Sequence, residues 1–272
     1  MKKSILILSV IILFASGCGR TNCSSEQTAI KTQKENPIIE NFQSEKLSEI
    51  KDKEEYRKLP EIKDIDLSKL LRKEINFMGM IGDDIQKMGI VFLSTTRISE
   101  NEYEIIGKSK IKDNVRDFKG IMKVQDVLES DIDGGEVSTV DGMITGKYSF
   151  AQDTTQYGTG VFEGYFKIYW AYGKNDVISL ADFWYTTSNY TILFEGSWKN
   201  YQTGETKNAC WTDYKGCFPD DFDMSDGPDL VPSEKYRSSG WGDKIDMFTA
   251  SDRETRKDAE KRFLENWVDW WK

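Results

Sequence analysis

Five times along this chain a glycine stands between two large apolar residues in a segment that alternates like a β-strand. These glycines are Gly79, Gly120, Gly142, Gly164 and Gly196. Glycine weakens an ordinary strand, because it has no side chain to pack and loses more conformational entropy than other residues. On the apolar face, however, the missing side chain lets a strand coil sharply, so that a sheet can curl without overfilling its interior. The pattern therefore predicts a strongly curved sheet.

From residue 76 onward the chain alternates with a period of two. Apolar residues take every second position, with mostly polar and charged residues between them, in the stretches 103–111, 140–150, 162–172 and 190–198. Further segments are expected near 76–81, 86–98, 116–125 and 176–186. The connections are short, which favours antiparallel pairing, because parallel strands need crossovers of a dozen or more residues. We predict a mainly β fold, an antiparallel meander of about eight strands that closes into a barrel, with a strongly bent sandwich as the alternative.

The N-terminus has the pattern of an exported lipoprotein. Two lysines precede a short apolar run, and Ala15-Ser16-Gly17-Cys18 resembles the lipobox of bacterial lipoproteins. Because the run is too short to span a bilayer as a stable helix, residues 1–17 are expected to be a signal peptide, with an uncleaved anchor as the alternative. The lipobox implies that Cys18 is acylated and attaches the mature chain to the bilayer. Residues 18–62 are expected to be a flexible, charged tether to a β domain over 63–249.

Charge and composition exclude several classes of function. The formal net charge is −9, and it becomes −11 when Lys2 and Lys3 leave with the signal peptide. This balance disfavours nucleic acid as a partner. The chain contains no histidine, which excludes histidine-dependent catalytic triads and histidine-ligated zinc or iron.

Several stretches between residues 76 and 242 together resemble a family of uncharacterised lipoproteins of Bacteroidota. They are FMGMIGDDIQ, GKSKIKDNVRDFKG, LFEGSWKNY and CWTDYKGCFPDDFDMSDGPDLVPSEKY, followed by Gly240-Trp241. The resemblance implies a single folded domain anchored in the cell envelope, at the outer membrane, and it supplies no catalytic residue. Surface-export signals in that group place acidic residues just after the lipidated cysteine, and residues 19–22 lack them. The periplasmic and surface faces therefore both stay open.

A second resemblance is to MORN repeats. Gly120, Gly142 and Gly164 are spaced 22 residues apart, and FEGSWKNYQTGE is similar to the hairpin core of that repeat. A MORN-like chain would be an open array of hairpins that serves protein interaction.

Aromatic side chains offer the candidate ligand contacts. If the curved sheet is hollow, a cavity in its mouth would be lined by Tyr148, Phe166, Trp170, Tyr190 and Trp198. A filled interior with an exposed aromatic patch would instead favour an envelope protein as the partner. We therefore expect a non-catalytic binding role for a small ligand, a glycan or an envelope protein. The alternative is a carboxylate-dependent hydrolase such as a glycosidase, which would draw on the acidic cluster from Asp126 to Glu136.

The region after residue 209 carries two further candidate sites. Cys210 and Cys217 are expected to form a disulfide, because they lie near a turn in an exported chain. A possible calcium site follows, with oxygen ligands from Asp221, Asp223, Ser225, Asp226 and Asp229. Its glycine comes one residue later than an EF-hand requires, so a solvated acidic loop is the alternative, and no other cofactor is expected.

Residues 250–272 are expected to form an amphipathic helix. Ser251 and Glu254 form a capping box at its start. The apolar residues of its later turns are Phe263, Leu264, Trp267, Val268, Trp270 and Trp271. We expect the helix to fold back on the β domain, with a position at a membrane interface as the alternative.

Overall fold

The structure is a computed structural model of the whole chain. It describes residues 56–58, 65–72, 75–130, 140–172, 178–182, 190–227 and 229–272. Residues Lys53–Lys272 form one compact unit. The predicted signal peptide, Cys18 and most of the predicted tether lie outside the described residues. No helix in the described part of the chain is long and apolar enough to span a membrane.

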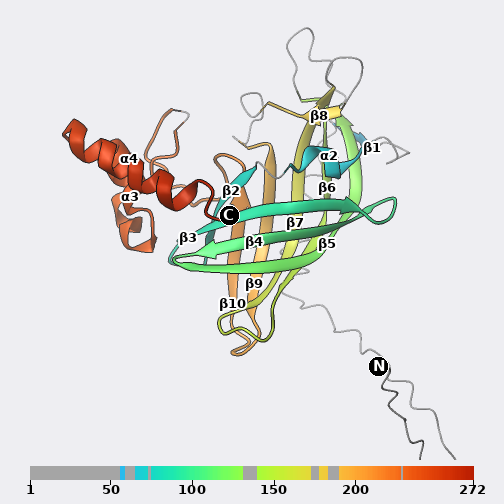
Figure 1. The fold of residues 1–272 in the computed structure, drawn as a ribbon. Helices are drawn as coiled ribbons and strands as arrows, with labels where there is room; N and C mark the ends of the chain where they lie inside the picture. The colour runs from blue at the N-terminus through green and yellow to red at the C-terminus, as the bar shows by residue number, and fades with distance from the viewer. Residues whose placement is uncertain are drawn as a thin grey trace, which may run out of the picture. The chain divides into compact units, whose positions relative to one another are not determined.

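Eight antiparallel strands close into a barrel, which confirms the predicted fold class (Figure 1). The strands are β2 (Asn76–Ile81), β3 (Gln86–Arg97), β4 (Glu102–Ile111), β5 (Asn114–Ser130), β6 (Gly142–Gln152), β7 (Gly160–Tyr172), β9 (Ile192–Asn200) and β10 (Thr206–Thr212). Each strand pairs with the next barrel strand along the chain, and β10 pairs back with β2 to close the ring. A closed ring is not the open hairpin array of a MORN protein.

Two strands differ from the expected positions. The eighth barrel strand is β10, whereas the segment near 176–186 contributes only β8 (Ile178–Leu180), which pairs with the end of β7 and lies off the barrel. The alternation of β10 is hidden in the sequence, because its last four residues are all buried, half of them inside the barrel and half beneath an outer layer. A short strand, β1 (Tyr56–Lys58), lies within the range expected for the tether and pairs with β5.

The five predicted glycines face the barrel interior, and most of them stand opposite a large aromatic residue of the neighbouring strand. The directly opposed pairs are Gly79 with Trp211, Gly120 with Phe150, Gly142 with Trp170 and Gly164 with Tyr148. Two further inward glycines follow the same rule, Gly107 with Phe118 and Gly146 with Phe166. Small and large residues thus alternate across facing positions, so that the side chains fill the interior without overlapping.

A side chain at these glycines would collide with the neighbouring strand. A Cβ at Gly142 would lie 2.5 Å from Cε2 of the Trp170 indole, and one at Gly146 would lie 2.5 Å from Cζ of Phe166. At Gly164 it would lie 2.7 Å from Cα of Gly196, its direct partner on β9. The glycines therefore serve two purposes: they let adjacent strands approach closely, and they leave room for the rings.

Rings fill the central part of the barrel. Phe92 contacts Phe77, Phe118, Phe150 and Phe194 with centroid distances of 5.1 to 6.2 Å. Edge-to-face and offset contacts of this kind are the favoured geometries of aromatic pairs. The network continues to Tyr148, Phe162, Phe166 and Trp211. The interior is thus a continuous hydrophobic core.

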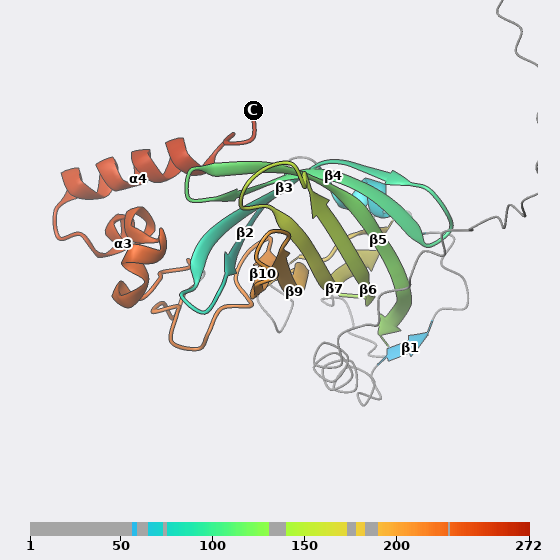
Figure 2. The same ribbon diagram turned by 90° about the horizontal axis from the view of Figure 1, so that it is seen from below.

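An outer layer of chain, residues 213–272, covers one side of the barrel. It contains a 3₁₀ helix, η4 (Glu234–Ser239), and two α-helices, α3 (Gly242–Thr249) and α4 (Arg253–Trp267). Figure 2 shows α3 and α4 beside the barrel, next to β2 and β3. A second buried cluster joins the layer to outward residues of β2: it consists of Ile85, Phe222, Leu230, Tyr236, Trp241 and Ile245, with Met78, Met80 and Phe218 packed against it. The predicted pair Cys210 and Cys217 forms a disulfide that ties this layer to β10.

The end of α4 packs on the outside of the barrel. Gly89 of β3 leaves space for two indoles, since a Cβ there would lie 3.1 Å from Cη2 of Trp267 and 3.2 Å from Cζ2 of Trp270. Asn76 donates to the carbonyl of Trp267 at 2.9 Å and accepts from Trp270 Nε1 at 3.2 Å. Lys110 donates to the carbonyl of Asn266 at 2.8 Å, which places a cation at the negative end of the helix.

The helix differs in detail from the expectation. Its N-cap is Asp252, whose carboxylate accepts from the backbone N–H of Thr255 at 2.8 Å, and not Ser251. It ends at Trp267, so Trp270 and Trp271 follow the helix. The expected apolar face also divides, because Leu264 and Val268 are exposed while Phe263 and Trp267 are buried.

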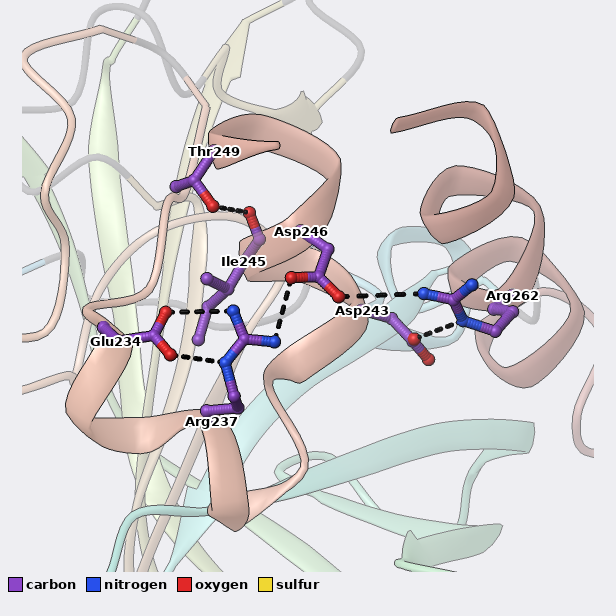
Figure 3. Close-up of polar contacts among 7 residues, drawn as sticks. All are labelled: Glu234, Arg237, Asp243, Ile245, Asp246, Thr249 and Arg262. Carbon is purple, nitrogen blue, oxygen red and sulfur yellow. Dashed lines mark hydrogen bonds and ion pairs between the residues drawn. The ribbon is translucent and has the colours of Figure 1, made fainter. Parts of the chain in front are cut away.

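Ion pairs connect the three helices of the outer layer (Figure 3). Arg237 of η4 forms an ion pair with Asp246 of α3 at 2.9 Å and also binds Glu234 on its own helix. Arg262 of α4 binds Asp243 at 2.8 Å and approaches Asp246 at 3.7 Å. Asp246 therefore lies between two guanidinium groups and joins η4 to α4 through α3. Such a network is worth more than isolated exposed pairs, which contribute little.

We predict that Gly146→Ala lowers the free energy of unfolding by about 3 kcal/mol or more, because the methyl group would overlap the Phe166 ring and the facing strand. Urea denaturation followed by tryptophan fluorescence measures this. The control is Gly242→Ala at the start of α3, where the nearest atom would lie 3.6 Å away. That change is expected to be neutral or stabilising. A Gly146→Ala protein within about 0.5 kcal/mol of wild type would contradict the role of the inward glycines.

Candidate functional site

The expected ligand-binding aromatics do not line an open mouth. Tyr148, Phe166, Trp170 and Trp198 are all buried in the interior core. Tyr190 lies outside that core and packs its ring 5.9 Å from Tyr169. The chain turns immediately before β9, where the carboxylate of Asp213 accepts from the backbone N–H groups of Thr191 and Ile192 at 3.0 and 2.8 Å. Alternation therefore does not extend back to Tyr190.

One end of the barrel is closed by a short helix. Helix α2 (Leu67–Leu70) begins at Asp66, whose side chain accepts from the backbone N–H of Ser68 at 3.1 Å. Leu67, Leu70 and Leu71 are buried in the interior core. The hydroxyl of Tyr103 donates to the carbonyl of Ile65 at 3.2 Å, which fixes the segment to β4. Helix α2 is thus part of the interior core.

The opposite end is closed by buried polar groups. The amide oxygen of Gln152 accepts from Gly160 N at 2.8 Å and from Trp198 Nε1 at 3.1 Å. Its amide nitrogen donates to the hydroxyl of Ser109 at 2.9 Å. Gln152 and Ser109 are buried, and their polar atoms satisfy one another across β4, β6, β7 and β9, as buried polar groups must.

Three buried donors in the interior have no hydrogen-bond partner within the described part of the chain. They are the hydroxyl of Tyr148 and the indole N–H groups of Trp170 and Trp211. Burial raises the pKa of Tyr148, so this hydroxyl stays protonated. The rings of Phe150, Phe194 and Trp211 lie 4.9 to 5.4 Å from the ring of Tyr148, measured between centroids. A ligand larger than water would have to displace them.

The acidic loop that could hold calcium already binds a cation of the chain itself. The ammonium of Lys215, which is buried, lies 2.6 Å from the carboxylate of Asp223. It also donates to the hydroxyl of Ser225 at 2.9 Å and to the carbonyl of Gly227 at 2.6 Å. Asp223 and Ser225 are two of the expected calcium ligands. Calcium binding at this loop stays a prediction, and it would require Lys215 to leave.

The remaining acidic residues of the loop do not converge on one point. Asp221 binds Lys235 and accepts from the hydroxyl of Tyr236 at 2.8 Å. Burial acts to raise the pKa of Asp223, but Lys215 and the backbone N–H groups of Val231 and Ser225 outweigh it, and the net shift is downward. In the described ranges no three acidic, cysteine or histidine side chains gather as a metal site needs.

The acidic residues considered for a glycosidase site are only partly described. Outside that cluster, burial raises the pKa of Asp213, whose carboxylate is bound by the backbone N–H groups of Thr191 and Ile192. Of the acidic cluster considered for catalysis, Asp126 and Glu129 lie on β5, and the residues from 131 to 136 lie outside the described residues. The hydrolase alternative therefore stays a prediction.

A lysine under the C-terminal helix is surrounded by rings. The ammonium of Lys87 lies 4.6 Å from the ring centroids of Phe263 and Trp267 and 5.8 Å from that of Trp241. In the described residues no carboxylate lies within ion-pair distance of it. Burial and the charge of Lys244 lower the pKa of Lys87 to about 8. Cation–π contacts thus hold a partly desolvated charge between β3 and α4.

The most exposed large aromatic residue that the structure describes was not among the expected site residues. Tyr157, in the turn between β6 and β7, is 86% exposed. Tyr201, in the turn between β9 and β10, is also exposed. The only sequence signal is local: Tyr157 stands in the uncharged run TTQYGTG, outside any strand pattern. Tyr165 and Tyr169 of β7, by contrast, are half-buried and buried.

Comparison of the chain with protein-family models, with curated proteins and with solved structures finds no match. The resemblance to Bacteroidota lipoproteins therefore stays a prediction.

We predict that CaCl₂ leaves the melting temperature of the wild-type protein unchanged relative to MgCl₂, because Lys215 occupies the position of the ion. Lys215→Met is expected to lower the free energy of unfolding by about 1–3 kcal/mol, since Asp223 loses its partner. Differential scanning calorimetry measures both effects, and Lys119→Met, at an exposed lysine of β5, is the control. A calcium-specific rise in the wild-type melting temperature would contradict the internal-cation account.

We predict a pH-dependent difference between wild type and Lys87→Met. The folded pKa of about 8 lies below the ordinary 10.5, so between these values the unfolded chain holds a proton that the folded chain has lost. The free energy of unfolding of the wild type therefore increases through Lys87 as the pH rises from 8 to 10.5. Below pH 8 the Lys87 ammonium stays charged in the folded protein, and its desolvation destabilises the fold. Lys87→Met should therefore be more stable than wild type near neutral pH.

The measurement is urea denaturation of both proteins across this pH range. The advantage of Lys87→Met should shrink as the pH rises, and Lys123→Met, at an exposed lysine of β5, should show no such trend. A constant difference between wild type and Lys87→Met would show that Lys87 does not titrate in this window.

Proposed function

We propose that this chain is a lipid-anchored protein of the bacterial cell envelope, at the outer membrane, whose barrel domain is a non-catalytic binding module. The N-terminal pattern that ends at Cys18 supports the anchor. The absence of histidine from the sequence supports a role without catalysis, because it excludes histidine-dependent triads.

The packing of the barrel interior with rings is the single observation that supports a binding site on the outside of the barrel. Lipid-carrying barrels hold their ligand in a cavity. Here the corresponding space contains rings in mutual contact, and α2 and Gln152 close its two ends. This packing supports a binding site on the outer surface, which includes the strand walls, the turns and the outer layer.

The anchor is tested by metabolic labelling with an alkyne analogue of palmitate and by cell fractionation. Wild type should be labelled and sediment with membranes. Cys18→Ser should lose the label, while Cys23→Ser, which alters a cysteine five residues away, should keep it. Membrane-bound, labelled Cys18→Ser protein would contradict the proposal.

The outer-surface role is tested with 1-anilinonaphthalene-8-sulfonate, a fluorescent probe that enters apolar cavities. The purified mature chain with Cys18→Ser should show no saturable binding, because the rings leave no room for it. Trp170→Ala, which removes a fully buried indole, should create a binding cavity if the protein folds. Saturable binding by the Cys18→Ser chain with Trp170 intact would contradict the outer-surface role and indicate a ligand site inside the barrel.

A further inference from the structure

Two turns lie side by side at one end of the barrel. The β6–β7 turn and the β9–β10 turn emerge together below the strands in Figure 1. Tyr201 N donates to the carbonyl of Thr159 at 3.0 Å, and the side chain of Gln202 donates to the carbonyl of Gln156 at 2.9 Å. We name the surface formed by residues 154–160 and 200–204 the turn surface.

The two segments of the turn surface contain no charged residue on a highly charged protein, although Arg116 of β5 borders them at the carbonyl of Tyr157. Its two segments read TTQYGTG and NYQTG and contain no aspartate, glutamate, lysine or arginine, whereas 31% of the whole chain is charged. A sample of this size from the chain would carry about four charged residues. Its exposed groups are instead hydroxyls, amides and tyrosine rings. Asp153, at its edge, is engaged by the backbone N–H and the hydroxyl of Thr155 at 2.9 and 2.7 Å.

Internal hydrogen bonds hold both turns in one conformation. The hydroxyl of Thr159 donates to the carbonyls of Asp153 and Gln156 at 2.7 and 2.8 Å. Asn200 Oδ1 accepts from the backbone N–H groups of Gln202 and Thr203 at 2.8 and 2.9 Å. Because the backbone is already ordered, a ligand that binds here does not have to pay for ordering it.

The ring of Tyr157 is the large apolar group that these bonds leave outside. Its backbone carbonyl accepts from Arg116 at 3.4 Å, but its side chain is 86% exposed. Such a ring contributes little to the core of the domain. A flat ring beside amide and hydroxyl groups, without charge, matches a neutral sugar: the ring stacks on the C–H face of a pyranose, and the polar groups bind its hydroxyls.

We propose that the turn surface binds a neutral polysaccharide, with Tyr157 as the stacking platform and the amide oxygens of Gln156 and Gln202 as hydrogen-bond acceptors. The amide nitrogens of these two glutamines donate within the turns, to Asp153 Oδ2 at 3.2 Å and to the carbonyl of Gln156 at 2.9 Å. The inference rests on the proposed binding role and names its ligand class. A protein partner fits less well, because protein hot spots lie in well-packed pockets whose surrounding contacts exclude water, whereas Tyr157 is 86% exposed at the tip of a turn. In the described part of these two turns, Tyr157 and Tyr201 are the only exposed large apolar side chains.

The test is affinity gel electrophoresis of the mature chain with Cys18→Ser in gels that contain soluble amylose, laminarin, glucomannan, xyloglucan or arabinoxylan. At least one neutral polysaccharide should retard the protein, whereas polygalacturonate should not. Tyr157→Ala should weaken that retardation at least about tenfold, because it removes the stacking ring. Tyr157→Phe should keep it. Ile98→Ala, which truncates an exposed apolar residue of the β3–β4 turn, is the control.

Each result decides the proposal. No retardation by any of the five neutral polysaccharides overturns it, and so does retardation that Tyr157→Ala leaves unchanged. If the sugars fail while Tyr157→Ala abolishes binding to a purified envelope protein, the turn surface is a protein interface: the glycan inference is then wrong and the binding role stands. Unchanged melting temperatures of all three variants show that the fold is intact. The palmitate and fluorescent-probe experiments test the proposed function independently of these outcomes.

Discussion

The pairing of an inward glycine with an aromatic ring on the next strand is the contact on which this barrel depends. Closing an antiparallel sheet brings inward side chains of neighbouring strands into a small volume. Large residues on every strand would overfill it, and small residues would leave a cavity. Here Gly142 faces Trp170 and Gly146 faces Phe166, so each ring occupies space that its partner leaves free. The same rule holds around much of the ring of strands.

The ring-filled interior is the reason that we propose a binding site on the outside of the barrel. In the described part of the chain, aromatic rings occupy the interior together with leucines of α2, and the outer layer packs on the outward faces of β2, β3 and β10. That layer is held by a disulfide, by the ion pairs around Asp246 and by rings around Lys87. The turn surface is the part of the described exterior where a rigid backbone presents an aromatic ring without charge, and it is therefore the strongest candidate for recognition.

Much of the fold could be predicted from the sequence, because glycine position and a period of two are local signals. The glycine positions and the two-residue period both indicate which face of a strand points inward. The failures have physical causes. Strand β10 is buried on both faces, so its alternation disappears. Tyr190 precedes a turn that Asp213 stabilises, so its even spacing from the inward residues of β9 does not predict which way its side chain points. The cation that fills the acidic loop comes from Lys215, whose approach depends on a fold around the Cys210 disulfide that no local pattern encodes.

The candidate site was harder to predict than the fold. Aromatic residues inside strands attract attention as ligand contacts, yet in a closed barrel they are core. Tyr157 lies in a turn, where its exposure depends on hydrogen bonds from Arg116 and Gln202 that join distant segments.

The most direct test of the glycine–ring pairing is proton NMR of the glycine Hα resonances. The account predicts upfield ring-current shifts for Gly107, Gly142 and Gly146, with nuclear Overhauser contacts to Phe118, Trp170 and Phe166. Unshifted glycine resonances without those contacts would contradict it.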